Sequence, residues 1–137
     1  MRVFLDANVL FSASNPGSNI EKLIAWIFKQ AVAVSSDLAI TEARRNILAK
    51  RAQWILSFEK IVSKIDQIDS VSFALPAKLA EKDIPLLCSA IRSKCDYFVT
   101  GDKRDFEHLF GRQVQGVHIV SLLQMADVLA EKFGNGS

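Results

Sequence analysis

Short apolar runs alternate with segments of helical period along most of the chain, and no other feature restricts the fold as strongly. Runs typical of strands stand at 2–5, 31–36, 97–100 and 117–120, and 70–75 alternates weakly, like an edge strand. Apolar residues recur at helical spacing over 20–28, 37–48, 55–65, 84–94, 102–110 and 122–133. Strands that alternate with helices form parallel sheets covered by helices on both faces. We therefore predict an α/β protein, a three-layer α/β/α sandwich whose central, mainly parallel sheet has four to five strands.

Composition sets further limits. With 137 residues, of which 50% are hydrophobic and 23% charged, the chain is expected to form one domain over 1–137, with a frayed tail at 133–137. The net charge of +2 permits an anionic partner without requiring one. Cys88 and Cys95 lack the spacing of a redox or zinc motif, so we expect reduced thiols in a cytoplasmic protein. No uncharged apolar stretch approaches the roughly 18 residues that span a bilayer, so no membrane partner is expected.

Three acidic residues, Asp6, Asp83 and Asp102, stand where strands end or where helices begin, and a fourth, Glu42, lies about a turn and a half into the helix after the second strand. Ligands of open parallel sheets collect at the carboxyl ends of the strands, so these side chains can converge there. Two carboxylates 4 Å apart repel each other by about 4 kcal/mol at an effective dielectric near 20, and a cluster of them therefore needs a divalent cation. Oxygen ligands favour Mg²⁺ or Mn²⁺, whereas the cysteines and histidines are too scattered for a zinc site.

Most of these acids also have a local explanation that needs no cation. Glutamate is a common helix former, so Glu42 can simply be solvated. Asp83 and Asp102 can be helix N-caps, and Asp105 can complement the dipole of a first helical turn instead of acting as a fifth ligand. Asp6 is harder to explain, because an ionised side chain directly after the buried run "VFL" needs water, a donor or a cation.

Four segments together resemble the PIN domain family, in particular the small stand-alone members that act as VapC-type toxins. The segments are "VFLDANVL", "TEARRNIL" around Glu42, "DIPLLCSAI" and "DYFVTGDKRDF", and the resemblance runs from residue 2 to about residue 125. It implies catalytic and metal-binding roles for Asp6, Glu42, Asp83 and Asp102, an additional ligand in Asp105, and support of these carboxylates by Asn8 and Thr100.

The function implied by this resemblance is metal-dependent cleavage of single-stranded or structured RNA. One or two Mg²⁺ or Mn²⁺ ions would orient a water for in-line attack on a phosphodiester, leaving 5′-phosphate and 3′-hydroxyl ends. A bound divalent ion suits this role because it lowers the pKa of water and neutralises developing charge. The alternative is a catalytically silent PIN-like module that binds RNA or protein. A phosphoacceptor receiver domain fits less well, since no pair of adjacent acids follows the first strand.

The partners of such an enzyme can also be proposed from the sequence. Basic residues beside the acids are the predicted grip on RNA phosphates, although solvated helix surfaces explain them as well: Arg44, Arg45, Lys103 and Arg104. The resemblance adds a cognate antitoxin protein and a homodimer as expected partners. The apolar residues of the 53–65 helix, or Trp26, are candidates for the dimer contact, but core packing accounts for them equally well.

Overall fold

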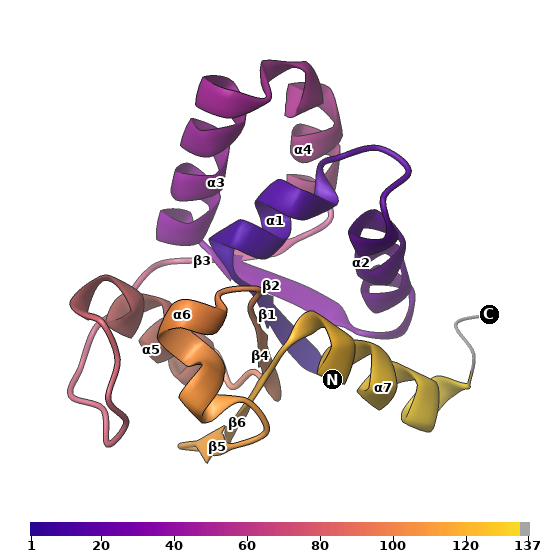
Figure 1. Ribbon diagram of the computed structural model, residues 1–137. Coiled ribbons are helices and arrows are strands. Elements are labelled where there is room, and N and C mark those ends of the chain that lie inside the picture. The colour runs from indigo at the N-terminus through magenta and orange to yellow at the C-terminus, as the bar shows by residue number, and fades with distance from the viewer. Residues whose placement is uncertain (135–137) are drawn as a thin grey trace.

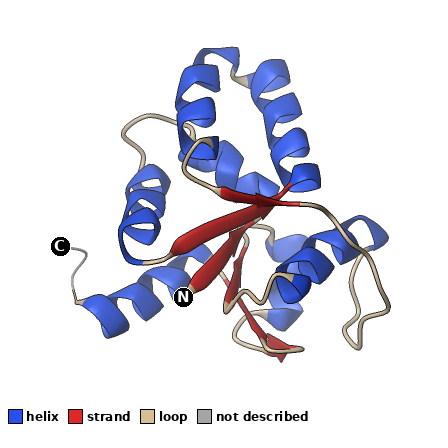
Figure 2. Ribbon diagram, turned by 180° about the vertical axis from the view of Figure 1, so that it is seen from behind, coloured by secondary structure: helices blue, strands red, loops and turns tan. Residues whose placement is uncertain are grey.

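The computed structural model describes residues 1–134 and shows a mostly parallel sheet with helices on both sides (Figure 1, Figure 2). The order of the strands is β3-β2-β1-β4-β6-β5, and only the β5–β6 pair is antiparallel. The strands are β1 (Arg2–Leu5), β2 (Val32–Ser36), β3 (Asp66–Ile68), β4 (Tyr97–Val99), β5 (Gln113–Val114) and β6 (Val117–Val120). The predicted α/β architecture is confirmed, and the described residues form six strands instead of the four to five predicted.

Helices connect the parallel strands. In Figure 1, α1 to α4 lie on one side of the sheet and α5 and α6 on the other, while α7 runs beside α2. The α-helices are α1 (Ala7–Ala13), α2 (Asn19–Gln30), α3 (Asp37–Lys50), α4 (Ile55–Val62), α5 (Ile84–Arg92), α6 (Lys103–Phe106) and α7 (Leu122–Phe133). Short 3-10 turns are η1 (Ala52–Trp54), η2 (Glu81–Asp83) and η3 (Glu107–Leu109). Ser36 caps α3, since its hydroxyl accepts a hydrogen bond from the Ala39 amide at 3.2 Å.

The two central strands fix the place of the site. Phe4 of β1 and Phe98 of β4 are fully buried, and their rings stack with centroids 5.2 Å apart. This packing aligns Leu5 with Val99 at the carboxyl ends of the strands. The Asp6 amide then donates to the Val99 carbonyl at 3.1 Å, so the segments that follow β1 and β4 leave the sheet side by side.

Three sequence predictions are wrong in detail. The segment 70–75 is a loop, not an edge strand, because its amides bond to side chains of α5: Val71 to the Ser89 hydroxyl and Phe73 to the Cys88 thiol. The edge strand is β3, a few residues earlier. Helix α1 and the short strand β5 were not predicted. Strand β5 joins β6 through a two-residue turn at Gln115 and Gly116, both with positive φ, a conformation typical of tight hairpins.

The remaining general predictions have mixed outcomes. Cys88 and Cys95 are free, buried thiols, as predicted. Within residues 1–134, no helix is long and apolar enough to cross a bilayer. Of the tail predicted at 133–137, Phe133 forms the last residue of α7, and 135–137 lie outside the described residues. Trp26 is half-buried against the core, and its indole Nε1 is buried without a hydrogen-bond partner.

Candidate metal centre

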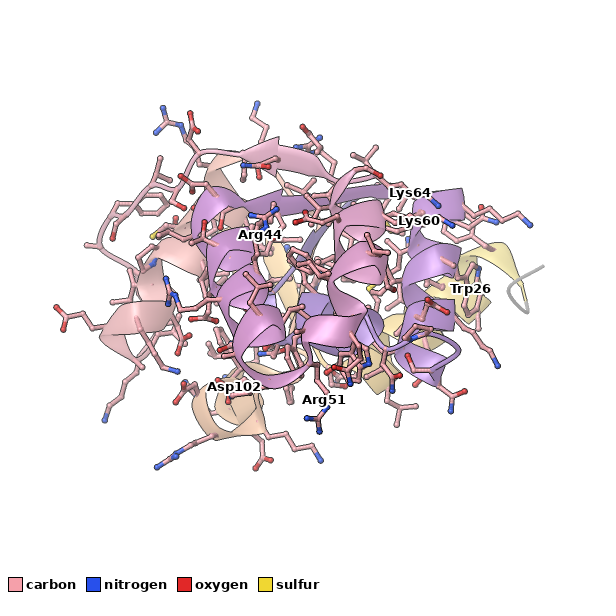
Figure 3. All side chains as sticks on the ribbon, turned by 90° about the horizontal axis from the view of Figure 1, so that it is seen from above. Trp26, Arg44, Arg51, Lys60, Lys64 and Asp102 are labelled. Atoms are coloured by element: carbon pink, nitrogen blue, oxygen red, sulfur yellow. The ribbon has the colours of Figure 1, made fainter. Side chains whose placement is uncertain are left out.

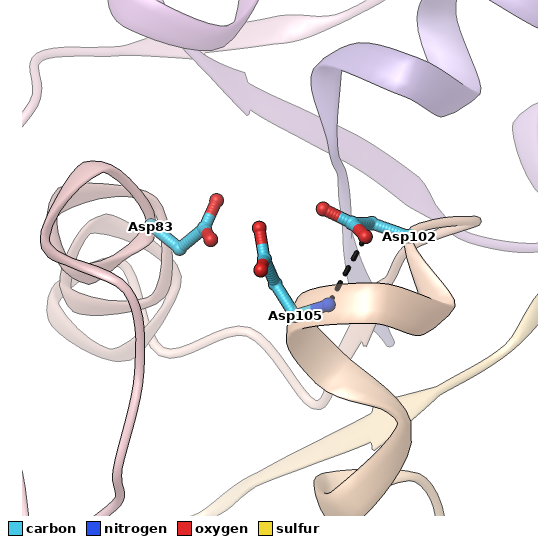
Figure 4. A group of neighbouring side chains, drawn as sticks. All are labelled: Asp83, Asp102 and Asp105. Atoms are coloured by element: carbon cyan, nitrogen blue, oxygen red, sulfur yellow. Dashed lines mark hydrogen bonds between the residues drawn. The ribbon is translucent and has the colours of Figure 1, made fainter.

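Three aspartates meet at the carboxyl edge of the sheet. Carboxylate oxygens of Asp83, Asp102 and Asp105 all lie within 4.8 Å of one another. Figure 4 shows the three side chains directed toward a common space, Asp83 from one side and the other two from the turn before α6 and from α6 itself. Because 18 residues of sequence and a whole strand separate Asp83 from the other two, the fold, not local spacing, brings them together.

Each of the three aspartates lies at the beginning of a helix. Asp83 closes η2 and directly precedes α5, but its side chain caps nothing, so the N-cap role considered for it is not filled by its carboxylate. Asp102 is the N-cap of α6, because its Oδ1 accepts from the Asp105 amide at 3.1 Å. The capping explanation of Asp102 is therefore correct, and one of its carboxylate oxygens also belongs to the cluster.

Asp6 lies at the end of β1, only 3% exposed, and hydrogen bonds hold both of its oxygens. Its Oδ1 accepts from the Ala7 amide at 2.8 Å, which makes Asp6 the N-cap of α1. Its Oδ2 accepts from the Thr100 hydroxyl at 2.8 Å and from the Asn8 amide at 3.2 Å. Asp6 therefore has a local role after all, as the N-cap of α1. The sequence did not indicate this role because it did not predict α1.

Asn8 and Thr100 join Asp6 to the turn that carries Asp102. The Asn8 Oδ1 accepts from the Gly101 amide at 2.8 Å, and the Thr100 Oγ1 accepts from the Asp102 amide at 3.0 Å. A Cβ atom at Gly101 would lie 3.3 Å from Asn8 Oδ1, so glycine allows this close approach. These bonds fix the position of the 100–102 turn relative to β1.

Burial and mutual repulsion raise the pKa values of two of the acids. Burial raises the pKa of Asp6 to about 6, the Thr100 and Ala7 hydrogen bonds oppose this rise, and the charges of Glu42 and Asp102 add to it. Burial, and next the adjacent Asp105 carboxyl group, raise the pKa of Asp83 to about 7. Asp83 and then Lys82 hold the pKa of Asp105 below its ordinary value. Without a cation, the neighbouring carboxyl groups of Asp83 and Asp105 therefore favour one negative charge over two.

Glu42 stands at the border of this cluster. It lies on an exposed part of α3 and, with Asn8 of α1, lines a cavity beside Asp6. Its charge acts on Asp6, but Glu42 is not among the three carboxylates that share the 4.8 Å cluster. The five acids singled out in the sequence thus form a tight group of three, with Asp6 and Glu42 next to it on the side of α1 and α3.

The donor set fits a hard divalent cation. The ligand atoms are carboxylate oxygens, which Mg²⁺ and Mn²⁺ prefer. Asp83 Oδ2 is buried and has no hydrogen-bond partner among the described residues, an arrangement that costs free energy unless a cation or proton compensates it. Asp83, Asp102 and Asp105 are therefore the residues that could hold such an ion.

The comparisons with known proteins support the fold. No family model and no curated protein matches the sequence. A chain in the crystal structure of VapBC2 from Rickettsia felis, bound to a DNA fragment from their promoter, matches with a TM-score of 0.64 at 14% sequence identity. The match covers 88% of this chain and 98% of that chain. At this level of identity the likeness concerns the fold alone, and it agrees with the mixed α/β architecture described above.

The predicted basic residues are divided between two environments. The Arg44 guanidinium forms a two-point ion pair with Glu59 of α4, at 2.9 and 2.7 Å, and lies 5.3 Å from the centre of the Phe58 ring. Figure 3 shows Arg44 well apart from Asp102. Arg45, Lys103 and Arg104 are exposed and form no ion pair among the described residues. Of the four predicted basic residues, these three therefore remain available to an anionic ligand.

Lys82 is a neighbour of the site that the sequence reading missed. Its ammonium lies 3.2 Å from Asp105 Oδ2 and is largely exposed, and the Asp105 carboxylate raises the Lys82 pKa. The only sequence signal was its place directly before Asp83. A further depression of about 430 Å³ lies beside Asp105 and Arg104, lined also by Lys78 and His108. The acids are thus bordered by hollows on two sides.

Proposed function

We propose that this protein is a Mg²⁺- or Mn²⁺-dependent endoribonuclease of the PIN type. The observation that carries the proposal is the group of three carboxylates from two segments far apart in the sequence, in which the buried Oδ2 of Asp83 has no hydrogen-bond partner among the described residues. A surface cluster of acids has no reason to bury one of its oxygens unpaired, whereas a cation site has. The agreement in fold with a chain of the VapBC2 structure adds support at the level of architecture.

The proposed roles follow from the positions of the side chains. Asp83, Asp102 and Asp105 would hold the cation, with Asp6 and Glu42 completing the acidic edge toward α1 and α3. When bound, the ion would supply Lewis-acid stabilisation of the phosphate and a water of lowered pKa for in-line attack. Asn8 and Thr100 would keep Asp6 and the 100–102 turn in place. Hydrolysis by this route leaves 5′-phosphate and 3′-hydroxyl ends.

Basic side chains beside the acids are proposed to bind the phosphates of the RNA substrate. Lys103 and Arg104 begin α6 next to Asp102, and Arg45 follows Glu42 by three residues on α3. Exposed basic groups of this kind attract phosphates in a salt-dependent manner. Arg44 is left out of this set because its guanidinium already pairs with Glu59.

The test is cleavage of end-labelled single-stranded RNA with Mg²⁺ or Mn²⁺, with EDTA as the metal-free control. Asp6→Asn and Asp83→Asn are expected to lower the cleavage rate at least 100-fold. Asp127→Asn, an exposed aspartate on α7, is the matched control and is expected to leave the rate unchanged. Absence of cleavage by folded wild type, or equal cleavage by Asp83→Asn, would contradict the proposal. Metal-independent RNA binding without cleavage would instead support the silent binding module.

We further propose an antitoxin-like protein partner and a homodimer. The support for a protein partner is the likeness in fold to a chain of VapBC2, a toxin–antitoxin complex. Expression of this chain alone should arrest growth of a bacterial host, and co-expression of an antitoxin encoded by a neighbouring reading frame should restore growth. Growth arrest that persists in Asp83→Asn would argue against a toxic nuclease.

Light scattering on the purified chain tests the homodimer. A monomer mass at micromolar concentration would contradict it.

A further inference from the structure

A cavity of about 220 Å³ opens between α1 and α3, directly beside the acids. Its lining side chains come from two helices that pack against each other: Asn8, Phe11, Ser12, Glu42, Asn46 and Lys50. Asn8 is hydrogen-bonded to Asp6, and the charge of Glu42 acts on Asp6, so the cavity is continuous with the acidic edge. A group held in this cavity would therefore lie next to whatever the acids bind.

Three polar side chains that line the cavity, Ser12, Asn46 and Lys50, have no side-chain partner within residues 1–134. The Asn8 side-chain amide already bonds within the protein: its nitrogen donates to Asp6 and Thr100, and its oxygen accepts from the Gly101 amide. In contrast, the side chains of Ser12 and Asn46 are half-buried and make no hydrogen bond within residues 1–134, and Lys50 forms no ion pair there. Half-buried donors and acceptors without protein partners are available to a ligand.

An aromatic surface completes the cavity. Phe11 is half-buried, and its ring centre lies 5.5 Å from that of Trp54 at an angle of 57°. The Arg51 guanidinium lies 5.6 Å from the Trp54 ring, and Figure 3 shows Arg51 toward the same edge of the molecule as Asp102. The Trp54 ring thus packs beside Phe11, which lines the cavity together with the polar groups. A flat aromatic surface beside donors and acceptors is the combination that binds unstacked bases of single-stranded RNA.

The size of the cavity agrees with a single base. Sites for drug-sized ligands measure roughly 300–1,000 Å³, and this cavity of about 220 Å³ is smaller. We infer that the cavity between α1 and α3 is a base-reading subsite of an RNA strand whose phosphate lies at the acids. In it, Phe11 stacks on the base, Asn46 and Ser12 bond to its edge, and Lys50 pairs with an adjoining phosphate. This assignment rests on the proposed ribonuclease function, because it takes RNA as the ligand.

Asn46 is the residue that should discriminate between bases. A side-chain amide offers a donor and an acceptor side by side, and its best-matched partner is adenine, with a bidentate pair that discriminates by roughly 10-fold or more. The probes are fluorescein-labelled eight-nucleotide RNAs, A₈, C₈ and U₈, whose binding is measured by anisotropy in EDTA so that no cleavage occurs. Wild type is expected to bind A₈ most tightly. Asn46→Ala should reduce the difference between the three RNAs to about twofold or less, with the largest loss for A₈.

Matched variants separate base reading from folding and from general RNA affinity. Alanine is a better helix former than asparagine, so Asn46→Ala should not unfold α3. Asn19→Ala, an exposed asparagine on α2, is the control and should bind all three RNAs like wild type. Phe11→Leu should weaken binding to all three by roughly 5-fold or more, because stacking does not depend on the base.

The outcome is independent of catalysis. Equal affinity of wild type for the three RNAs, or an unchanged order of affinities in Asn46→Ala, would overturn the base-reading subsite even if the enzyme cleaves RNA. Loss of discrimination in Asn46→Ala would support the subsite even if no cleavage is found. The same wild-type preparation is assayed for cleavage with Mg²⁺, so failure of the nuclease proposal is recorded separately.

Discussion

The Asp6 carboxylate is unusual because the fold both encloses it and binds it on both oxygens. The Ala7 amide and the Thr100 hydroxyl orient the group, while burial raises its pKa to about 6. A structural cap would not need to be so deeply buried beside Glu42 and Asp102. The arrangement holds a carboxylate at an acidic edge in a fixed orientation, and its burial carries a cost in stability that the two hydrogen bonds only partly offset.

The cost predicts the pH dependence of the metal-free protein. Between the ordinary pKa of 3.8 and the folded value of about 6, native Asp6 keeps a proton that the unfolded chain has released. Stability therefore falls as pH rises through this window, and the penalty is complete above it, at about 3 kcal/mol for a shift of this size. Asp83, whose pKa is also raised by burial, extends the decline toward pH 7. Urea unfolding in EDTA from pH 4.5 to pH 7.5 measures it.

Substitution of Asp6 separates its contribution from that of other groups. Asp6→Asn should reduce the decline and make the metal-free protein more stable than wild type at pH 7.5. Asp127→Asn should leave the slope as it is, because Asp127 is exposed on α7. A wild-type stability that rises from pH 4.5 to pH 7.5, or equal slopes in wild type and Asp6→Asn, would contradict the prediction.

Lys82 predicts a second effect at the scale of one residue. Its ammonium lies 3.2 Å from Asp105 Oδ2, next to the proposed ligands. A fixed positive charge at this place repels a divalent cation, although solvent weakens the effect because Lys82 is largely exposed. Lys82→Ala should therefore lower the Mg²⁺ concentration at the midpoint of the thermal shift by about threefold, and Lys82→Arg should not. Lys29→Ala, on α2, serves as the control, and a higher midpoint in Lys82→Ala would refute the repulsion.

At the scale of the elements, the contact between α3 and α4 binds Arg44, whereas Arg104 on α6 is exposed, so their substitutions should affect RNA binding differently. Arg44 pairs with Glu59 and lies over Phe58, so Arg44→Ala should lower the free energy of unfolding by about 0.5–1 kcal/mol and change RNA affinity less than about twofold. Arg104 is exposed beside the acids, so Arg104→Ala should weaken RNA binding and lower the slope of log affinity against log salt by about 1. A salt slope that falls in Arg44→Ala but not in Arg104→Ala would reverse these assignments.

The alternation of strands and helices could be predicted because it depends on local patterns. Strands β1, β2, β4 and β6 and helices α2, α3, α5 and α7 lie where apolar periodicity indicates them. Helix α1 was not predicted because its seven residues are too few for a periodic signal. Burial of Val9 and Leu10 and the Asp6 cap stabilise it instead. The loop at 70–75 alternates like a strand, yet its amides bond to Cys88 and Ser89, and no sequence pattern reveals such a long-range partner.

The candidate site was predictable in its order but not in its distances. The sequence places acids at strand and helix ends, and parallel-sheet topology predicts that they share one edge. It could not distinguish the close group of Asp83, Asp102 and Asp105 from the looser approach of Glu42, because this depends on how the segments that carry them pack in the folded chain. For the same reason the pairing of Arg44 with Glu59, between two helices, was not foreseen. Whether these residues act as proposed stays a prediction.

At the scale of the whole molecule, two chains of very different sequence share one fold. The chain of the VapBC2 structure matches with a TM-score of 0.64 at 14% identity. One fold is compatible with such different sequences, since cores accept many apolar substitutions that keep volume and pattern. Polar residues at the carboxyl edge are not replaceable in that way if they hold an ion. The chain's net charge of +2 also means that an anionic strand must be bound by local groups, not by the overall field.

Binding of a divalent cation should therefore be visible in the stability of the entire domain. A ligand that binds only the native state adds about 2.7 kcal/mol at 100 times its Kd, which raises Tm by roughly 10 °C in a domain of this size. The rise should be larger at pH 8 than at pH 6, because protons compete for Asp83, whose pKa is raised to about 7. Differential scanning fluorimetry with MgCl₂ or MnCl₂, against NaCl of equal ionic strength, measures it.

Variants then locate the cation. Asp83→Asn and Asp102→Asn should each abolish the rise in Tm, because each removes one of the three converging carboxylates. Asp69→Asn, an exposed aspartate after β3, should keep it. A cation held nonspecifically by surface charge would stabilise all of these variants alike and would lose its effect in NaCl. If wild type shows no rise with 10 mM of either metal, the three aspartates do not form a cation site.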